Sequence, residues 1–186
     1  KILFVATKKQ AKTIVAESAK SLNMPYITER WPGGLLTNFS TIRKSIKKMN
    51  SIDTMKEDGT FDTLSKREKL QIERTREKLE LNFGSIENMN RIPEAIFVVD
   101  INKEHIAVAE ANKLGMRSYA MVDTNTNPKL VNFPIPANDD STKSISKIMQ
   151  IISEAIAEGL SERSKTIEEK AKIKQEKAKE ILNKDN

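Results

Sequence analysis

The sequence contains no cysteine, one histidine and one tryptophan, which excludes disulfides and thiolate metal sites and fits a reducing compartment. No apolar run approaches the roughly 18 residues that a membrane-spanning helix needs, so we expect no membrane span. Hydrophobic residues make up 38% of the 186 residues and charged residues 31%. This composition is charge-rich for a compact fold, and it predicts that part of the chain is solvated helix.

The motifs that usually bind phosphate in an α/β fold are missing as well. Residues 2–6 predict a strand, but the sequence that follows, Thr7-Lys8-Lys9-Gln10, has no glycine, which excludes a dinucleotide fingerprint or a P-loop there. Asp100 and Asp123 end later predicted strands, and we favour turn capping over a catalytic role for both. For Asn138-Asp139-Asp140-Ser141 we favour a helix cap over a cation site. No cofactor or metal is therefore predicted.

Charge is unevenly distributed along a chain whose formal net charge is +6. Residues 1–40 carry 6 basic and 2 acidic side chains, whereas residues 82–158 carry 7 basic and 10 acidic ones. Such asymmetry indicates one basic face directed at a polyanion.

Two strand–helix–strand units predict the body of the fold. The first has strands at residues 2–6 and 25–28 around a helix at 11–22, and the second has strands at 95–100 and 118–123 around a helix at 104–114. Units of this kind give parallel strands with right-handed crossovers. Residues 124–136 contain three prolines and are expected to form a loop, followed by a packing helix at 145–160. We predict a doubly wound α/β body made of residues 1–39 and 85–160.

Residues 40–84 predict a different kind of structure. Ser40 or Thr41 can cap a helix with a narrow apolar stripe, and Ser65 and Glu68 have the spacing of a capping box that starts a second, charge-rich helix. Two amphipathic helices with too little apolar surface for a core predict an antiparallel coiled-coil hairpin inserted in the body. Residues 161–186 are rich in Lys and Glu and are expected to be a solvated helix or disordered.

Basic and polar residues that suit a nucleic-acid backbone gather in the first 48 residues. Arg30 can offer a planar set of donors to phosphate, and adjacent glycines let a partner approach backbone amides closely. The single tryptophan, Trp31, either anchors this loop in the core or stacks on a base. The candidate RNA-binding residues are Lys8, Lys9, Lys12, Arg30, Trp31, Gly33, Gly34, Thr37, Asn38, Arg43, Lys44, Lys47 and Lys48.

Several longer motifs then resemble one known family from residue 2 to about residue 159. They are Ile-Leu-Phe-Val-Ala-Thr-Lys-Lys-Gln at 2–10, Met-Pro-Tyr at 24–26, Arg-Trp-Pro-Gly-Gly-Leu-Leu-Thr-Asn-Phe at 30–39, Glu-Asp-Gly-Thr-Phe at 57–61, Ile-Phe-Val-Val-Asp at 96–100, Val-Asp-Thr-Asn at 122–125 and Phe-Pro-Ile-Pro-Ala-Asn-Asp-Asp at 133–140. In this order they resemble the bacterial ribosomal protein S2 family of the small subunit.

The resemblance implies a flavodoxin-like parallel sheet flanked by helices, with an inserted antiparallel coiled-coil hairpin. It also implies a structural constituent of the small ribosomal subunit, not an enzyme. The partners it implies are small-subunit ribosomal RNA and neighbouring ribosomal proteins, including the large messenger-binding protein built of OB-fold domains. It further implies an N-terminal segment that precedes residue 1. The expected location is the cytoplasmic ribosome, and the sequence does not exclude an organellar one.

Two other functions stay open on the sequence. One is a phosphosugar- or nucleotide-binding α/β enzyme or sensor that uses Thr7, Asp100 and Asp123 at the strand ends. The other is an adaptor that acts only through its coiled-coil hairpin.

Overall fold

The computed structural model describes the backbone of residues 1–184 and the side chains of residues 1–166. The chain divides into two compact units, Lys1–Met149 and a second that begins at Gln150. The first unit contains all the strands of the described residues, and the second consists of the continuing helix α5 (Thr142–Lys184). Among the described residues no helix is both long enough and apolar enough to cross a bilayer.

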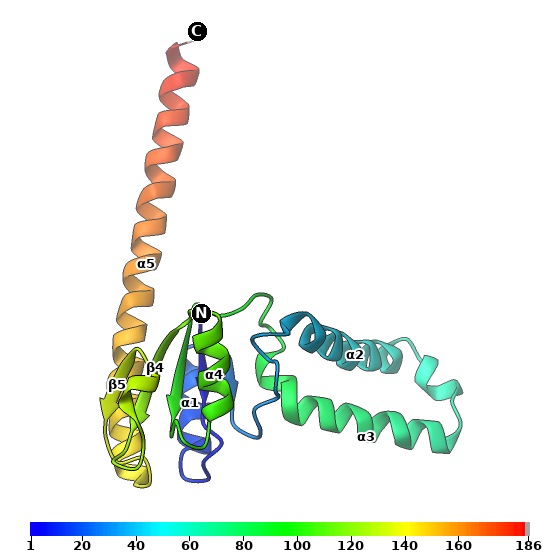
Figure 1. The fold of residues 1–186 in the computed structure, drawn as a ribbon. Helices are drawn as coiled ribbons and strands as arrows, with labels where there is room; N and C mark the ends of the chain where they lie inside the picture. The colour runs from blue at the N-terminus through cyan, green and yellow to red at the C-terminus, as the bar shows by residue number, and fades with distance from the viewer. Residues whose placement is uncertain (185–186) are drawn as a thin grey trace. The chain divides into compact units, whose positions relative to one another are not determined.

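One parallel sheet forms the centre of the first unit (Figure 1). Its strands are β1 (Ile2–Val5), β2 (Tyr26–Ile27), β3 (Ala95–Val99), β4 (Arg117–Val122) and β5 (Phe133–Pro136). All four neighbouring pairs are parallel, and the strand order is β2-β1-β3-β4-β5. This 2-1-3-4-5 order is that of flavodoxin-like sheets. The predicted parallel sheet flanked by helices is confirmed.

A row of aromatic side chains crosses the sheet on one face. The register pairs Phe4 with both Tyr26 and Phe97, then Phe97 with Tyr119, and Tyr119 with Phe133. Phe4 and Phe97 have ring centroids 5.7 Å apart, and Tyr119 stacks on Phe133 at 4.6 Å. Each of the five strands therefore contributes one ring at the same level, which places most of the chain's few aromatic residues where they pack best.

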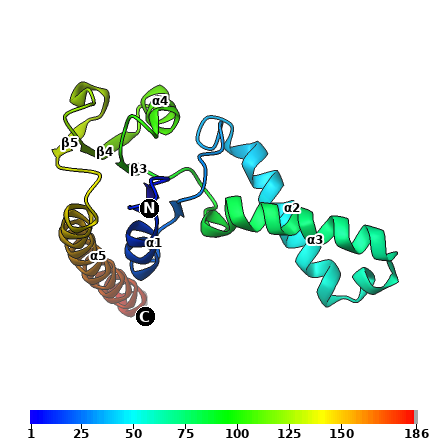
Figure 2. The same cartoon turned by 90° about the horizontal axis from the view of Figure 1, so that it is seen from below.

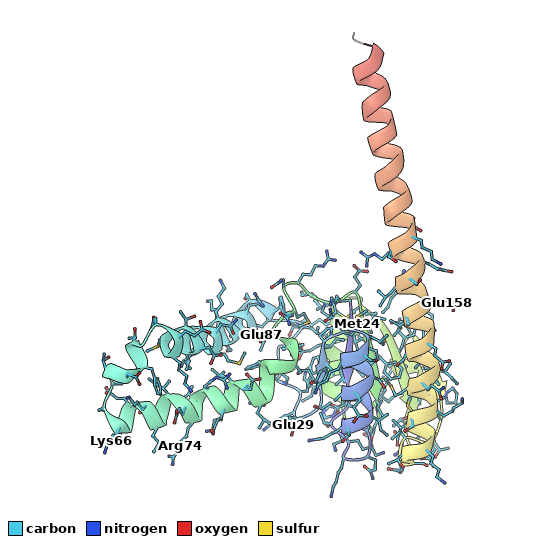
Figure 3. The ribbon with its side chains drawn as sticks, turned by 180° about the vertical axis from the view of Figure 1, so that it is seen from behind. Met24, Glu29, Lys66, Arg74, Glu87 and Glu158 are labelled. Carbon is cyan, nitrogen blue, oxygen red and sulfur yellow. The ribbon has the colours of Figure 1, made fainter. Side chains whose placement is uncertain are left out.

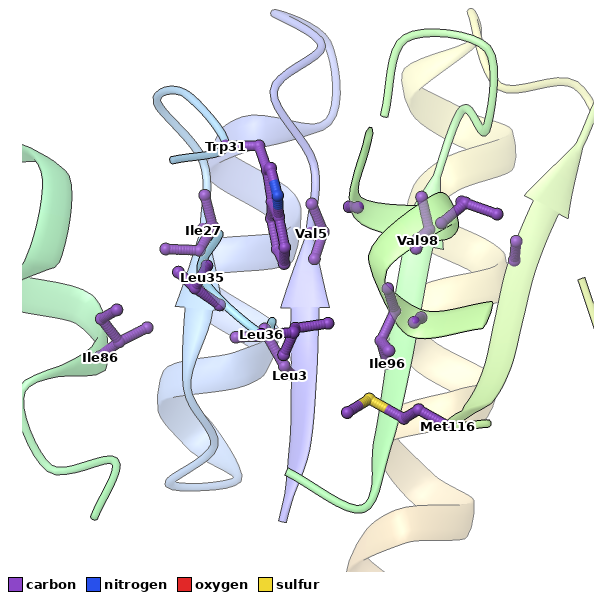
Figure 4. Packing of buried hydrophobic residues seen from close by; sticks show 14 of the residues in the cluster. Leu3, Val5, Ile27, Trp31, Leu35, Leu36, Ile86, Ile96, Val98 and Met116 are labelled. Carbon is purple, nitrogen blue, oxygen red and sulfur yellow. The ribbon is translucent and has the colours of Figure 1, made fainter. Parts of the chain in front are cut away.

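The opposite face of the sheet carries the larger apolar cluster. Leu3, Val5, Ile96 and Val98 project from the central strands into this cluster, where Trp31 also lies (Figure 4). The helix α4 (His105–Lys113) covers this face, while α1 (Lys12–Ser21) lies on the other (Figure 2). Strands that are buried on both faces explain why β1 and β3 are continuous apolar runs without alternation.

Two local expectations are corrected. Residues 124–136 are not only a loop, because they contain a short 3₁₀ helix at Pro128–Leu130 and the strand β5. The prolines in this segment favoured a loop in the sequence analysis, but a strand at the edge of a sheet tolerates proline. The helix α2 (Phe39–Glu57) begins after Asn38, and neither Ser40 nor Thr41 is its N-cap. Instead the Thr41 hydroxyl donates to Asn38 Oδ1 at 2.9 Å.

The helices α2 and α3 (Lys66–Phe83) lie side by side and pair in reverse order. Asp53 binds Arg76 at 2.5 Å, Lys56 lies 3.8 Å from Glu73, and Asp62 lies 3.5 Å from Lys69. The capping box predicted at Ser65 and Glu68 is confirmed, with both of its reciprocal hydrogen bonds present. At the turn between the helices, the ammonium groups of Lys56 and Lys69 lie 5.2 and 5.6 Å from the Phe61 ring.

The last helix runs further than the predicted packing helix. Ile145 and Met149 are fully buried in the first unit. Beyond them α5 continues through Gly159 to Lys184, so the backbone of residues 161–184 is helical. Residues 185–186 of the expected tail lie outside the described residues.

The two prolines of the edge strand β5 predict that this edge of the sheet does not pair with a further strand. The amide of Ala137 donates to the carbonyl oxygen of Val122 at 3.2 Å, so the backbone N–H positions of alternate residues in β5 point toward β4. The N–H positions of residues 134 and 136 point outward instead. Both residues are prolines and have no N–H to offer a further strand. We expect the double variant Pro134→Val/Pro136→Val to restore two outward donors and to self-associate more than the parent chain, as measured by sedimentation velocity. Pro128→Val, which adds a donor away from this edge, is the control and should leave the sedimentation coefficient unchanged. Equal sedimentation of the double variant and the parent would contradict this role of the prolines.

Candidate nucleic-acid interface

A single buried carboxylate organises the loop between β2 and α2. Glu110, on α4, is 8% exposed and accepts hydrogen bonds on both of its oxygens. Oε1 accepts from the Trp31 ring N–H at 3.0 Å and from the Gly34 amide at 2.7 Å. Oε2 accepts from the amides of Leu36 and Thr37, each at 3.0 Å, and from the Thr37 hydroxyl at 3.1 Å. The loop is therefore folded around one negative charge that belongs to the protein itself.

This arrangement corrects the expected role of the glycine pair. Gly34 has a φ of +85°, a conformation that favours glycine, and its amide points inward to Glu110. The amides that we expected to be open to a partner are thus already bonded, at least at residues 34, 36 and 37. Gly33 stays exposed. Trp31 is 6% exposed and lies against the sheet (Figure 4), so of its two possible roles the structure supports the anchor.

The hydrogen bonds also set the protonation of Glu110. Burial favours the neutral acid, but the donors of Thr37, Trp31, Gly34 and Leu36 outweigh it and lower the pKa of Glu110. The carboxylate is therefore ionised at neutral pH, and the loop keeps its acceptor.

Lys8 lies in an acidic cluster at the carboxyl ends of the strands. Its Nζ atom is 2.5 Å from Asp139, 2.6 Å from Asp140 and 3.3 Å from Asp100, and its side chain is only 13% exposed. Burial works against the charged amine, but hydrogen bonds with Asp139 and Asp140 outweigh it and raise the pKa of Lys8. Carboxylate oxygens of Asp123, Asp139 and Asp140 lie within 4.8 Å of one another, a grouping that could hold a metal ion, but here Lys8 supplies the opposing charge.

Asp100 acts as the turn cap we favoured. Its Oδ1 atom accepts from the amides of Asn102 and Lys103, both at 3.1 Å, and its φ is +68°. Asn138 likewise caps the turn before α5, because its side-chain oxygen accepts from the amides of Asp140 and Ser141. The neighbouring Asp139 does not cap and binds Lys8.

A second buried carboxylate lies between β1 and β3. Glu104 is 3% exposed and accepts from both the amide, at 2.9 Å, and the hydroxyl of Thr7. Thr7 and Glu104 line a small pocket of about 210 Å³ with Arg30, Trp31 and Lys103. Flavodoxin-like sheets bind ligands at this switch point between β1 and β3. Here the amide after β1 is already bonded to a carboxylate.

The structure separates the candidate cations into two groups. Lys8 and Arg43 are bound within the protein, Arg43 through the carbonyls of Glu87 and Met89 at 3.2 and 3.3 Å. Lys12 is half-buried and 2.9 Å from Glu29. The cations that remain exposed, with no ion pair among residues 1–166, are Lys9, Arg30, Lys44, Lys47 and Lys48. Thr37 and Asn38 are exposed at the end of the loop.

Reasoning from the sequence missed Glu110 and Glu104, the two carboxylates that order the site. Both lie on or beside the apolar stripe of α4, which is formed by Ala107, Val108 and Ala111. An acidic residue on the buried side of a helix has to be hydrogen-bonded, and this was the available signal.

The fold and these exposed cations describe a parallel α/β protein with a basic surface beside an internally ordered loop. The comparisons with known proteins are more specific. The family model of ribosomal protein S2 matches residues 1–159, and the chain belongs to this family.

Its relatives include the small ribosomal subunit proteins uS2 of three bacteria. That of Flavobacterium johnsoniae is 66% identical over 163 residues, which are 88% of this chain and 64% of the relative. That of Flavobacterium psychrophilum is 65% identical over 164 residues, 88% of this chain and 62% of the relative. That of Christiangramia forsetii is 64% identical, over 88% of this chain and 54% of the relative. The chain thus spans less than two thirds of the length of these relatives.

The Glu110 network predicts a loss of stability on a nearly isosteric change. In Glu110→Gln one oxygen becomes an amide nitrogen that cannot accept, which leaves buried donors of the loop unsatisfied. We expect the free energy of unfolding to fall by about 3 kcal/mol. Urea denaturation followed by the fluorescence of Trp31, the only tryptophan, measures it directly. The matched control is Glu77→Gln at an exposed position, which should change the free energy of unfolding by less than about 0.5 kcal/mol. Equal stabilities of the two variants would contradict a stabilising role of the Glu110 hydrogen bonds.

The lowered pKa of Glu110 predicts that the difference in unfolding free energy between the parent and Glu110→Gln depends on pH. The unfolded chain has an ordinary glutamate pKa of about 4.3. Stabilisation by the ionised group is complete above that value and is lost as the pH falls through the lower folded-state pKa. The stability gap between the parent and Glu110→Gln should therefore narrow as the pH is lowered from about 6 to about 3. A gap that stays constant over this range would show that ionisation of Glu110 is not its source.

Proposed function

We propose that this chain is a structural constituent of the small ribosomal subunit and that it binds ribosomal RNA and neighbouring ribosomal proteins. The observation that carries the proposal is the family match over residues 1–159, together with relatives that are named as small ribosomal subunit proteins. The exposed cations of the loop and of α2 support it, because they remain available to a polyanion. The role is scaffolding without catalysis, on ribosomes of the cytoplasm.

In this proposal the RNA contacts use side chains that the protein leaves unpaired. Lys9 and Arg30 follow β1 and β2, and Lys44, Lys47 and Lys48 lie on α2 opposite its buried stripe of Ile42, Ile46, Met49 and Ile52. Lysine and arginine at such positions neutralise phosphates, while Asn38 and the exposed Gly33 offer hydrogen-bonding groups. Trp31, Gly34 and Thr37 contribute by holding the loop on Glu110. Lys8, Lys12 and Arg43, which are engaged within the protein, act as positioning residues.

We further propose that residues 40–84, which comprise most of α2 and all of α3, are an inserted antiparallel coiled-coil hairpin that reaches a second RNA or protein surface. Two ion pairs between the helices, Asp53 with Arg76 and Lys56 with Glu73, run in reverse order and support this arrangement. The neighbours would include the large messenger-binding protein of OB-fold domains. The division into a body of residues 1–39 and 85–160, this hairpin and a tail from residue 161 is part of the same proposal.

The alternative of a phosphosugar- or nucleotide-binding enzyme is disfavoured by the switch point of the sheet. The Thr7 amide, which would meet a ligand phosphate, is bonded to Glu104, and Asp100 caps its own turn while binding Lys8. Carboxylates at these positions repel an anionic ligand. An adaptor that acts only through α2 and α3 leaves the exposed Lys9 and Arg30 of the body without a role.

The proposal predicts RNA binding with a strong dependence on salt. We expect the triple variant Lys44→Gln/Lys47→Gln/Lys48→Gln to bind small-subunit ribosomal RNA more weakly than the parent. The slope of log K against log salt should become shallower by up to about 2.7, because each lost phosphate contact removes about 0.9 from it. Filter binding at several salt concentrations measures both quantities.

A control variant with the same charge change separates specific contacts from net charge. Lys113→Gln/Arg117→Gln/Lys129→Gln removes three exposed cations of the body, none of which is ion-paired in the described part of the chain. Its affinity should exceed that of the α2 triple variant. Binding by the parent that is weak and independent of salt would exclude the proposed function.

A further inference from the structure

The two sides of α3 differ in how their cations are used. On the side toward α2, Arg76 binds Asp53 and Glu80, and Lys69 lies 3.5 Å from Asp62. On the opposite side, Arg67, Arg74 and Lys78 are exposed and have no ion pair within residues 1–166. Figure 3 shows Arg74 pointing away from α2. A helix that uses its inward cations and leaves three outward ones unpaired presents an open basic face.

These outward residues form a continuous stripe, which we name the outer face of α3. Its positions follow the i, i+3, i+4, i+7 spacing of one helix side. They are Arg67, Leu70, Gln71, Arg74, Lys78 and Leu81. A shallow groove lies along the first five of them, bordered by Thr75. Between Arg67 and Lys78 the helix rises by roughly 16 Å, so the three cations span a length of several nucleotides.

The carboxylates of α3 do not neutralise this face. Glu68 closes the capping box with Ser65, Glu73 lies 3.8 Å from Lys56, and Glu80 lies 3.6 Å from Arg76. The remaining one, Glu77, is exposed and lies three residues after Arg74 and four before Leu81, so it is on the same side of the helix. This side of α3 therefore carries three cations, Arg67, Arg74 and Lys78, against one carboxylate.

The outer face also leads toward the loop of the body. Leu81, at its end, lines a pocket with Thr28 and Glu29, which directly precede Arg30. In Figure 3, Glu29 lies where α3 meets the body. The pocket is also lined by Glu80, and its two carboxylates are paired within the protein, Glu29 with Lys12 and Glu80 with Arg76. A long polyanion lying along α3 would therefore come next to Arg30 after passing this pocket.

We infer that the outer face of α3 binds the phosphate backbone of a ribosomal RNA segment that continues toward Arg30. This inference rests on the proposed function and adds a second RNA-binding surface, built from residues of the expected hairpin that are not among the candidate RNA-binding residues of the sequence analysis. RNA fits this face because its three cations lie in one row along roughly 16 Å of helix, where they can meet phosphates of one strand. Leu70 and Leu81, 49% and 64% exposed, supply apolar contacts for the sugars between the phosphates.

The test compares three triple variants of the full chain with the parent. They are the α3 variant Arg67→Gln/Arg74→Gln/Lys78→Gln, the α2 variant Lys44→Gln/Lys47→Gln/Lys48→Gln and the control variant Lys113→Gln/Arg117→Gln/Lys129→Gln. We expect the α3 variant to bind small-subunit ribosomal RNA at least tenfold more weakly than the control variant at about 0.15 M salt, with a salt slope shallower by about 2 to 3. Circular dichroism should show equal helix content in all four proteins, since every changed residue is exposed.

Nuclease footprinting with the same proteins locates the contact. An RNA segment protected by the parent and by the α2 variant, but not by the α3 variant, would support the inference. If the α3 variant matches the control variant in affinity, slope and footprint while the α2 variant is weakened, the inference is wrong and the proposed function stands. The inference is also wrong, and the proposed function stands, if the α3 variant keeps its RNA affinity but no longer binds a purified small-subunit protein. Salt-independent RNA binding by the parent would reject both the inference and the proposed function.

Discussion

The Glu110 carboxylate is the interaction on which the functional surface depends. It lies on α4, which packs on the sheet, and five donors from residues 31–37 converge on its two oxygens. The same loop also buries Trp31, Leu35 and Leu36 in the apolar cluster. Since α2 begins at Phe39, directly after this loop, the same carboxylate fixes where α2 leaves the body. A neutral side chain at this position could not accept so many donors at once. One buried negative charge therefore connects the sheet to the loop and to the start of α2, where the exposed cations lie.

A second constraint is the pairing of charge inside the protein. The chain has 32 Lys and Arg residues, but the structure uses several of them internally: Lys8 balances three aspartates, Arg43 binds two carbonyls and Arg76 joins α3 to α2. Such residues gain little from a phosphate, because binding it would first break contacts that the fold needs. Only unpaired cations release counterions when RNA binds. Counting basic residues therefore overstates the proposed interface, and sorting them by partner removes those that the fold itself engages.

Much of the fold was predictable because it depends on local patterns. Buried runs such as residues 95–99 predicted strands, and the Ser65 and Glu68 spacing predicted the start of α3, since a capping box is complete within one turn. What failed depends on distant partners. The strand β5 contains two prolines and becomes a strand only because β4 offers it an edge. Glu110 is an ordinary acid in a short helix, and its importance comes from donors about 75 residues earlier, which no local pattern encodes.

The ligand edge of the sheet explains how a flavodoxin-like fold can serve as a scaffold. In such folds the crevice between β1 and β3 binds a ligand because free amides and helix ends make it attractive to anions. Here Glu104 accepts from the Thr7 amide, and Asp100 and Asp139 surround Lys8, so the groups that could bind an anion are already bonded within the protein, and only a small pocket of about 210 Å³ remains. The same contacts join the segments that follow the strands, where Lys9 and Arg30 lie. Bonding these groups internally thus disfavours a small-molecule site and at the same time fixes the base of an outward-facing basic surface.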